Sequence, residues 1–182
     1  MGRDKALLTL DGRSLVERTV RVLGAVVEDV MVVGRAYPLP GDLRARCIQD
    51  ERPGAGPLGG LYTGLRHVAH DHVVVVACDL PFLSASLLQY LLEQAPGHEA
   101  VVPRVDGRAQ PTHAVYARRI EETVARSLRG GSYRMEALLG ALRTRWVEED
   151  EIDAVDPGHQ SFVNVNTLEE WERAAVTARR MP

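Results

Sequence analysis

Lysine is almost absent from this 182-residue chain: Lys5 is the single lysine, and all other basic residues are arginine. Arginine binds planar acceptors through a rigid fork, whereas lysine is a compact point charge, so the two are not interchangeable in a tight phosphate site. The remaining lysine therefore has two interpretations. It marks a position that only a point charge fits, or it is the chance survivor of a compositional bias.

Cysteines and long apolar runs are also scarce. Cys47 and Cys78 each lie in or beside an apolar run, which favours free thiols in a reducing compartment over a structural disulfide. No apolar stretch is long enough to span a bilayer, and the first residues lack the apolar core of a signal peptide. The net charge of −3 and the pI near 6.1 provide no basic surface for nucleic acid or an anionic membrane. We therefore expect a cytoplasmic protein without nucleic-acid or membrane partners.

The rest of the composition is that of one globular domain over residues 1–182, with 45% hydrophobic and 26% charged residues. Helix and strand patterns alternate along the chain. Helices are expected at about 14–23, 58–69, 84–94, 118–128 and 132–142 and from 167 onward; strands are expected at about 29–33, 46–48, 73–76, 100–103, 112–117, 144–147 and 162–165. This alternation predicts an α/β fold with a single doubly wound, mostly parallel sheet.

Asp79 is the first candidate site residue. It follows the valine run 73–76, which is apolar on both faces and typical of a central parallel strand. Ligands of open α/β sheets bind beyond the carboxyl ends of the strands, and a carboxylate there commonly holds Mg²⁺ with substrate phosphates. The alternative is a turn aspartate, because the segment Asp-Leu-Pro-Phe can form an Asx-turn.

A glycine-rich segment follows the strand expected at 46–48 and leads into a helix. Its glycines allow close approach of a flat ligand, and the helix start leaves backbone donors free. The alternative is an ordinary connection between a strand and a helix. By itself this segment is a weak signal for nucleotide binding.

Asn164 and Asn166 alternate along the strand expected at 162–165, so they are expected on one face. An amide oxygen can complete the oxygen shell of a metal beside a carboxylate. Helix N-capping is the competing interpretation for Asn166 and Thr167. The histidines show no metal-ligand spacing, and the sequence contains no Cys-x-x-Cys, Gly-x-Ser-x-Gly or full Walker A pattern. Redox, hydrolase and P-loop chemistry are therefore disfavoured.

Five segments occur in an order and spacing that resemble a known family. They are MGRDK at 1–5, GPLGGL at 56–61, ACDLPF at 77–82, QPTHAVY at 110–116 and NVNT at 164–167. The chain resembles the molybdenum cofactor guanylyltransferases, the molybdopterin-guanine dinucleotide biosynthesis protein A family, over essentially its whole length. The resemblance implies a Rossmann-like nucleotidyltransferase fold.

The resemblance also implies roles for individual residues. Lys5 matches the lysine that contacts the GTP phosphates, and Asp79 matches the Mg²⁺ carboxylate; these two are the implied catalytic residues. The remaining implied residues are Asp50, Gly56, Pro57, Leu58 and Gly59 for the nucleotide, Gln110, His113, Asn164 and Asn166 for the pterin, and Asn164 as a further metal ligand.

The reaction implied by the resemblance is transfer of GMP from GTP to molybdopterin with release of pyrophosphate, dependent on Mg²⁺. GTP and molybdopterin would be the substrates, and acceptor molybdoenzymes or cofactor chaperones would be protein partners. Positioning and charge neutralisation are the main requirements of such a step. The residues noted above supply carboxylate, amide and ammonium groups and no activated nucleophile.

The chain departs from the family at its start. The family's loop reads Leu-Ala-Gly-Gly-x-Ser-x-Arg-Met-Gly-x-Asp-Lys, and the match begins at Met1, so the first half of this loop and the strand before it are expected to be missing. We expect either an internal methionine of a longer reading frame or a shortened relative. Two alternatives to the guanylyltransferase remain: a sibling nucleotidyltransferase that uses CTP or a sugar phosphate, and a non-enzymatic nucleotide- or pterin-binding protein.

Overall fold

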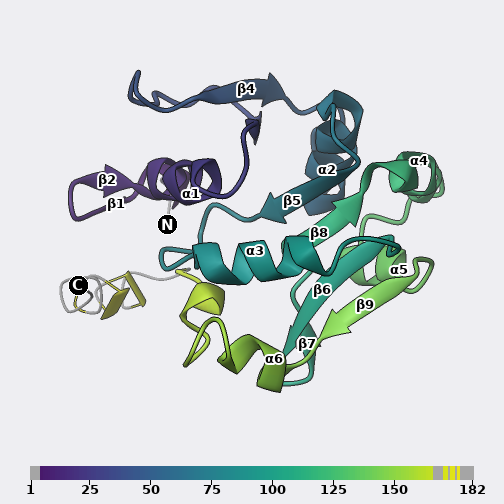
Figure 1. Cartoon of the computed structure of the whole chain (residues 1–182). Coiled ribbons are helices and arrows are strands. Elements are labelled where there is room, and N and C mark those ends of the chain that lie inside the picture. The colour runs from purple at the N-terminus through teal and green to yellow at the C-terminus, as the bar shows by residue number, and fades with distance from the viewer. Residues whose placement is uncertain (1–4, 166–169, 172, 175, 177–182) are drawn as a thin grey trace.

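The structure is a computed structural model that describes residues 5–165, 170, 171, 173, 174 and 176. Helices and strands alternate along the chain, as the sequence predicts (Figure 1). Their bounds, in chain order, are η1 Lys5–Leu7, β1 Thr9–Leu10, β2 Arg13–Ser14, α1 Leu15–Gly24, β3 Val30–Gly34, β4 Ala45–Gln49, α2 Gly56–His67, β5 His72–Val76, α3 Ala85–Glu93, β6 Ala100–Val105, β7 Arg108–Ala109, β8 His113–Ala117, η2 Arg118–Ile120, α4 Glu121–Arg129, α5 Met135–Leu139, β9 Thr144–Val147, α6 Glu149–Asp153 and η3 Gln160–Phe162.

The strands form three separate sheets within the described residues, so the prediction of one mostly parallel sheet is wrong. β1 pairs with β2, β3 pairs with β4 in parallel, and the third sheet has the order β5-β8-β6-β7 with β9 beside β6. β8 runs antiparallel to both β5 and β6, while β6 and β9 are parallel. β8 runs against its neighbours because of the hairpin at 106–107, where Asp106 has a φ of 50°. The chain turns back there, and β8 enters the sheet in the opposite direction to its neighbours.

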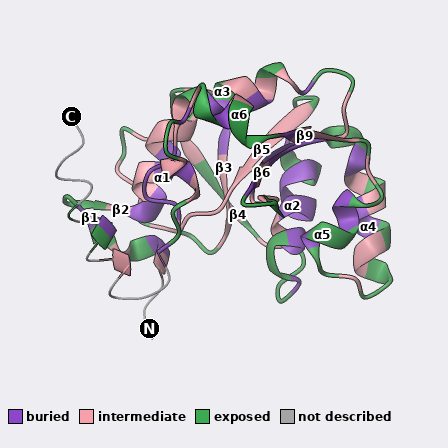
Figure 2. Cartoon of the chain, turned by 90° about the horizontal axis from the view of Figure 1, so that it is seen from below, coloured by how far each residue is buried: buried purple, intermediate pink, exposed green. Residues whose placement is uncertain are grey.

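Two hydrophobic clusters cover opposite faces of the five-stranded sheet. Ala114 and Tyr116 on β8 face one cluster with α2, α4 and α5, whereas Val115 between them faces the other with α3 and α6. This alternation is the period of two expected for a strand. A third cluster holds α1 against β3, so this part of the molecule has its own small core (Figure 2).

The predicted helices are confirmed in type and approximate position. The side chain of Ser14 accepts a hydrogen bond from the Glu17 backbone amide and caps α1, as Ser84 caps α3 through Leu87. The predicted helices at 118–128 and 132–142 are shorter, because the first begins with the 3₁₀ turn η2 and the second covers only α5. Thr167, the predicted start of the last helix, lies outside the described residues.

The predicted strand at 162–165 is wrong. Residues 160–162 form η3, and the following described residues are irregular. The backbone amide of Val165 donates to the Asp79 carbonyl at 3.2 Å, which is one bond rather than a ladder. Asn164 therefore has no strand face on which to lie, and Asn166 falls outside the described residues.

Among the described residues, no helix combines the length and apolar character that crossing a membrane requires. Cys47 and Cys78 form no disulfide within the described residues.

Candidate active site

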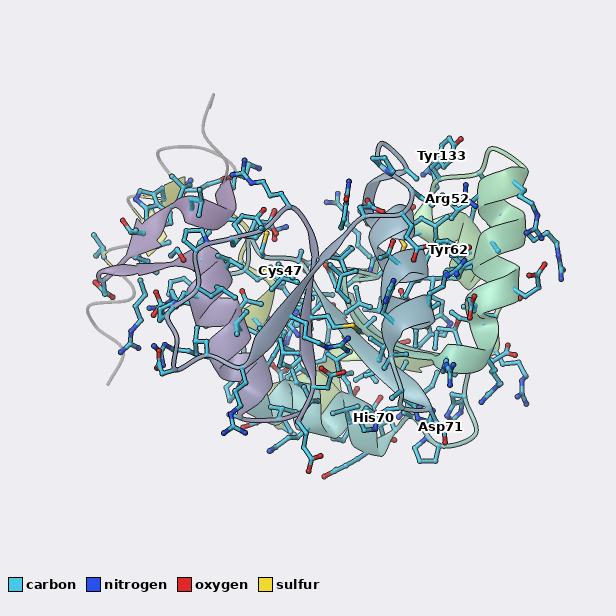
Figure 3. The ribbon with its side chains drawn as sticks, turned by 90° about the horizontal axis from the view of Figure 1, so that it is seen from above. Cys47, Arg52, Tyr62, His70, Asp71 and Tyr133 are labelled. Atoms are coloured by element: carbon cyan, nitrogen blue, oxygen red, sulfur yellow. The ribbon has the colours of Figure 1, made fainter. Side chains whose placement is uncertain are left out.

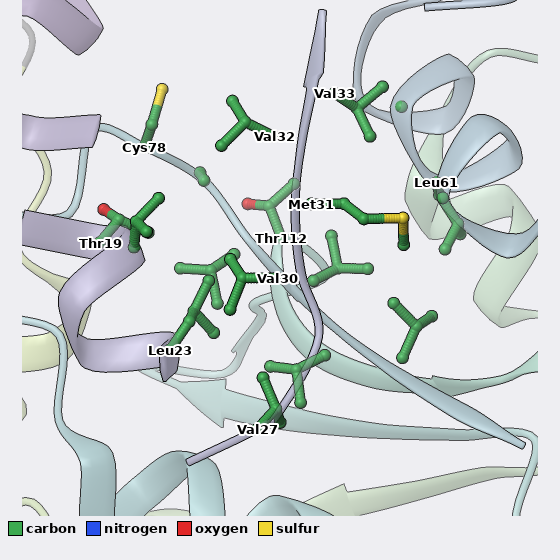
Figure 4. Close-up of a pocket in the computed structure, with 18 of the residues that line it drawn as sticks. Thr19, Leu23, Val27, Val30, Met31, Val32, Val33, Leu61, Cys78 and Thr112 are labelled. Carbon is green, nitrogen blue, oxygen red and sulfur yellow. The ribbon is translucent and has the colours of Figure 1, made fainter. Parts of the chain in front are cut away.

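Three of the predicted site residues, Lys5, Pro57 and Asp79, line one cavity of about 700 Å³, whereas Asp50, Gly56, Leu58, Gly59 and Asn164 do not line it. Lys5 comes from η1, Asp79 from the turn after β5, Pro57 from the first turn of α2, and Thr112 from the residue before β8. Figure 4 shows the wall of this cavity, which includes Thr112, Cys78 and valines of β3. Segments far apart in the sequence thus meet at the carboxyl end of β5.

Backbone hydrogen bonds on both sides hold the turn that carries Asp79. Ala77 N donates to Thr112 O at 2.8 Å, and Val165 N donates to Asp79 O at 3.2 Å. The Nε of Arg18 on α1 donates to the Pro81 carbonyl at 3.4 Å. The Asp79 side chain is half-buried and lines the cavity. The backbone of Asp79 is consequently held at the carboxyl end of β5, the edge at which ligands of open α/β sheets bind.

Asn164 lies beside this turn because Val165, its neighbour, is bonded to the Asp79 backbone. It is exposed, so its amide is accessible to a ligand. The described residues contain no group of three or more His, Cys, Asp and Glu side chains able to hold a metal. A donor set of one carboxylate and one amide fits Mg²⁺, which is usually held by one or two carboxylates together with substrate phosphates and water.

Ser161 and Asp156 position the segment that carries Asn164, and the sequence analysis missed both roles. The hydroxyl of Ser161 accepts from Ser84 N at 2.8 Å and donates to the Phe82 carbonyl at 3.4 Å. Its backbone amide donates to Asp156 Oδ2 at 3.1 Å, and both side chains are buried. The only signal in the sequence is a serine next to the asparagine motif, which does not by itself reveal a contact 77 residues away.

Asp50 organises the glycine-rich loop. Its Oδ1 accepts from Arg52 N at 2.8 Å and from Thr63 Oγ1 at 3.1 Å, which ties the end of β4 to the middle of α2. Thr63 Oγ1 also accepts from Glu51 N at 3.0 Å. The second carboxylate oxygen of Asp50 accepts no hydrogen bond from the described part of the chain. The turn-forming role of this aspartate is therefore seen directly in the structure.

The start of α2 combines backbone freedom with close packing. Gly56 has a φ of 62°, a conformation that favours glycine, and a Cβ at Gly59 would lie 2.7 Å from the Arg52 carbonyl oxygen. No side chain among the described residues caps this helix. Leu58 is fully buried in the main core, so only its backbone can reach a ligand. The backbone amides at the start of α2 make this end of the helix positive.

Gln110 lies between β7 and β8, and His113 is the first residue of β8, the strand next to β5. Gln110 N donates to Pro103 O at 2.9 Å, and His113 pairs in register with Val76. His113 is 2% exposed and its ring lies 4.8 Å from that of Phe162. Burial lowers the pKa of His113 from 6.5 to about 4, although a smaller effect of the adjacent Ser161 backbone raises it. Neither ring nitrogen has a hydrogen bond of good geometry within the described part of the chain, so this histidine is neutral and enclosed.

Basic and aromatic side chains surround the outer side of the glycine-rich loop. The guanidinium groups of Arg52 and Arg66 lie 5.4 and 5.7 Å from the centre of the Tyr62 ring. A smaller cavity of about 290 Å³ beside them includes Arg129 and the exposed Tyr133 (Figure 3). The sequence analysis did not single out this cluster, because arginines are distributed along the entire chain.

Comparison with known proteins agrees with this geometry. Residues 1–146 match the family described as MobA-like NTP transferase domain. The chain belongs to this family. It is therefore a nucleotidyltransferase.

Relatives of this nucleotidyltransferase align with nearly the whole chain. It is 34% identical to a molybdenum cofactor guanylyltransferase of Desulfosudis oleivorans, over 99% of this chain and 91% of the relative. Its fold is similar to that of molybdopterin-guanine dinucleotide biosynthesis protein A from Archaeoglobus fulgidus, with a TM-score of 0.84, 24% identity and coverage of 99% and 93%. It is also similar to 2-C-methyl-D-erythritol 4-phosphate cytidylyltransferase from Thermus thermophilus, with a TM-score of 0.76, 22% identity and coverage of 96% and 94%.

A structure with the same fold has been solved with a divalent metal. This Mycobacterium tuberculosis protein, in complex with manganese, has a TM-score of 0.64 to the present chain and 16% identity, over 96% of this chain and 93% of the other. A divalent metal is accordingly compatible with this fold.

Proposed function

We propose that this protein transfers GMP from GTP to molybdopterin. An oxygen of the terminal phosphate of molybdopterin attacks the α-phosphorus of GTP, the bond from that phosphorus to the β-phosphate oxygen breaks, and pyrophosphate leaves. The attacking phosphate is already ionised, so the step needs no protein base. Its requirements are alignment of the two phosphates and neutralisation of their charge.

One observation carries this proposal: Lys5 and Asp79 line the same cavity, together with Pro57 in the first turn of α2. An ammonium group and a carboxylate are the kinds of group that bind a triphosphate and its metal. They come from separate stretches of the chain. The near full-length relative, named as a molybdenum cofactor guanylyltransferase, supports GTP and molybdopterin as the substrates.

On the nucleotide side, Lys5 would bind phosphate oxygens and Asp50 would bind the guanine nucleotide through its remaining carboxylate oxygen. Gly56, Pro57, Leu58 and Gly59 would act through the backbone, because the Leu58 side chain is enclosed by the core. Asp79 would hold Mg²⁺ with Asn164 as a second oxygen donor. Mg²⁺ bound there would neutralise charge on the phosphates.

On the pterin side we propose Gln110, Asn164 and Asn166 as contacts. His113 is too deeply buried to touch a substrate in this arrangement. Its ring instead packs against Phe162, next to Ser161, and so supports the segment that leads to Asn164. Acceptor molybdoenzymes or cofactor chaperones in the cytoplasm remain the predicted partners.

Substitution of Asp79 by alanine tests this function. We expect loss of far more than tenfold in Mg²⁺-dependent formation of the dinucleotide, because removing the protein anchor of a metal costs several kcal/mol of transition-state stabilisation. Asp71→Ala is the matched control, since Asp71 is an exposed carboxylate just before β5, at the other end of the same strand (Figure 3). Residual Asp79→Ala activity within about tenfold of the wild type, roughly 1.4 kcal/mol, would contradict a primary metal ligand.

The choice of nucleotide needs its own measurement, because the cytidylyltransferase fold is also similar to this one. Competition between GTP and CTP for the wild-type protein decides between the two. Tighter binding of CTP would favour the sibling nucleotidyltransferase. Nucleotide binding without any turnover in the presence of molybdopterin would favour the non-enzymatic alternative.

A further inference from the structure

Thr63 on α2 carries a fully buried hydroxyl where this helix meets the loop after β4. Its Oγ1 accepts from Glu51 N at 3.0 Å and lies within donor distance of two oxygens, Asp50 Oδ1 at 3.1 Å and Gly59 O at 3.0 Å. A hydroxyl has one hydrogen, so it donates to one of these oxygens at a time. The charged carboxylate is the stronger acceptor, and the hydrogen of Thr63 therefore points to Asp50.

The loop lies so close to α2 that Asp50 has little freedom to turn. A Cβ at Gly59 would lie 2.7 Å from the Arg52 carbonyl oxygen, so the two backbones approach closely there. The Arg52 guanidinium lies 5.4 Å from the centre of the Tyr62 ring on the same helix (Figure 3). The Arg52 amide also donates to Asp50 Oδ1 at 2.8 Å. Oδ1 thus has two donors, one from the loop and one from the helix.

The two acidic side chains of this loop have different surroundings. The Glu51 carboxylate lies 3.4 Å from Arg66 Nε and 2.8 Å from His67 Nε2 on α2. Asp50 Oδ2, by contrast, accepts no hydrogen bond from the described part of the chain. Asp50 is half-buried and follows β4 at its carboxyl end, where ligands of open α/β sheets bind. Its Oδ2 can therefore accept from a ligand.

We infer that Thr63 is a positioning residue that sets the preference of this site for guanine. In the function proposed above, on which this role depends, Asp50 binds the guanine nucleotide. Guanine presents N1–H and an adjacent 2-amino group as donors, whereas hypoxanthine, the base of ITP, lacks the amino group. With Oδ1 held by Thr63 and the Arg52 amide, Oδ2 accepts from the 2-amino group. Without the Thr63 hydroxyl the carboxylate keeps one anchor and can rotate, so the two bases are distinguished less well.

The nucleotide selectivity of the full chain tests this role. Calorimetry in the presence of Mg²⁺ gives the Kd of GTP and of ITP for the wild type, Thr63→Val and Thr63→Ser. Valine has the shape of threonine without the hydroxyl, and serine keeps the hydroxyl. We expect the wild type to bind GTP about tenfold more tightly than ITP, Thr63→Val to reduce this ratio to about twofold or less, and Thr63→Ser to retain it.

The ratio separates positioning from a merely structural role, which would weaken the binding of both nucleotides equally. Thr123→Val is the matched control, since it makes the same substitution at a half-buried threonine of α4, the helix that packs against α2, and it should keep the wild-type ratio. Thr63→Val also removes the acceptor of Glu51 N, so circular dichroism verifies that the variant is folded. Thr63→Cys, whose thiol is a weak donor, replaces it if valine prevents folding, and the same loss of selectivity is expected.

A ratio in the folded Thr63 variant within about twofold of the wild type would overturn the positioning role. The double variant Asp50→Ala, Thr63→Val provides a second criterion. Once the carboxylate is absent, loss of the hydroxyl should not change the ratio further, and an additional change would show that Thr63 acts by another route. Equal binding of GTP and ITP by the wild type would also overturn the inference. The proposed reaction fails separately, if the wild type forms no dinucleotide from GTP and molybdopterin.

Discussion

Lowering the pH from 7 to 4 should destabilise this protein largely through one side chain, His113. Its ring is 2% exposed on β8 and lies against Phe162. Burial disfavours the charged imidazolium and lowers the pKa of His113 to about 4, although the neighbouring Ser161 backbone favours the charged form slightly. In the unfolded chain the same histidine takes up a proton near pH 6.5.

The size of the effect follows from these two pKa values. Between pH 6.5 and 4 the unfolded state binds a proton at this site and the folded state does not, so the free energy of unfolding decreases as the pH falls. The maximum slope is about 1.4 kcal/mol per pH unit, and the total loss by pH 4 is about 3 kcal/mol. Well above pH 6.5, His113 is neutral in both the folded and the unfolded state, and none of this stability is lost. A loss of this size is a large part of the roughly 5–15 kcal/mol that stabilises a typical domain.

Urea unfolding of the wild type and of His113→Leu, at each pH from 7 to 4, measures this contribution. We expect the wild type to lose about 3 kcal/mol more than the variant across this range, because leucine does not titrate. Glu151 also has a shifted pKa: the Arg145 guanidinium, with Tyr90 and the Glu148 backbone, lowers the pKa of this carboxyl to about 2. The stability that ionised Glu151 contributes is lost at low pH in the wild type and in His113→Leu alike, so it cancels in the difference between them.

His70→Gln serves as the matched control, because His70 is exposed before β5. This variant should follow the wild type at every pH. If the wild type and His113→Leu lose stability in parallel between pH 7 and 4, the histidine is not enclosed as described and the reasoning fails.

Three further substitutions test the site. Lys5→Arg should lower GTP affinity and kcat/KM by more than about tenfold in a radiolabelled GMP transfer assay, because a guanidinium is wider and differently hydrated; wild-type values would show that any cation serves. Asn164→Ala should impair turnover or pterin use while the Kd for GTP stays within about twofold, whereas a large loss of GTP binding with normal pterin binding would contradict its assignment. Gly59→Ala should destabilise the protein by about 1–3 kcal/mol in urea, since the new Cβ would lie 2.7 Å from a backbone oxygen, and Gly60→Ala, with open space around it, should not; equal effects would argue against this close packing.

Local sequence patterns predicted the elements of this fold well. The capping serines Ser14 and Ser84 start α1 and α3, and the predicted strand at 144–147 has the observed bounds. The Asp106-Gly107 pair is a sequence typical of a tight turn, and both residues have the positive φ that such a turn between β6 and β7 requires. These features depend on nearby residues only, and their physical causes are visible in a short stretch of chain.

Strand direction was predicted less well. The sequence of β8, His-Ala-Val-Tyr-Ala, does not alternate between polar and apolar residues, so it carries no sign of its antiparallel position between β5 and β6. The segment at 162–165 has a strand-like composition, yet its single bond to Asp79 leaves it irregular. Pairing depends on which edges are available in space, and that information is absent from a local pattern.

For the site, the sequence by itself determined which chemical groups are available: one lysine, a carboxylate after a valine strand, a glycine-rich helix start and an exposed amide. Tertiary structure alone decided that Lys5 and Asp79 line the same cavity and that Leu58 and His113 are enclosed. It also revealed the Ser161 hydrogen bonds and the antiparallel position of β8. The physical reason is that residue type sets what a side chain can bind, whereas long-range packing sets what it can reach.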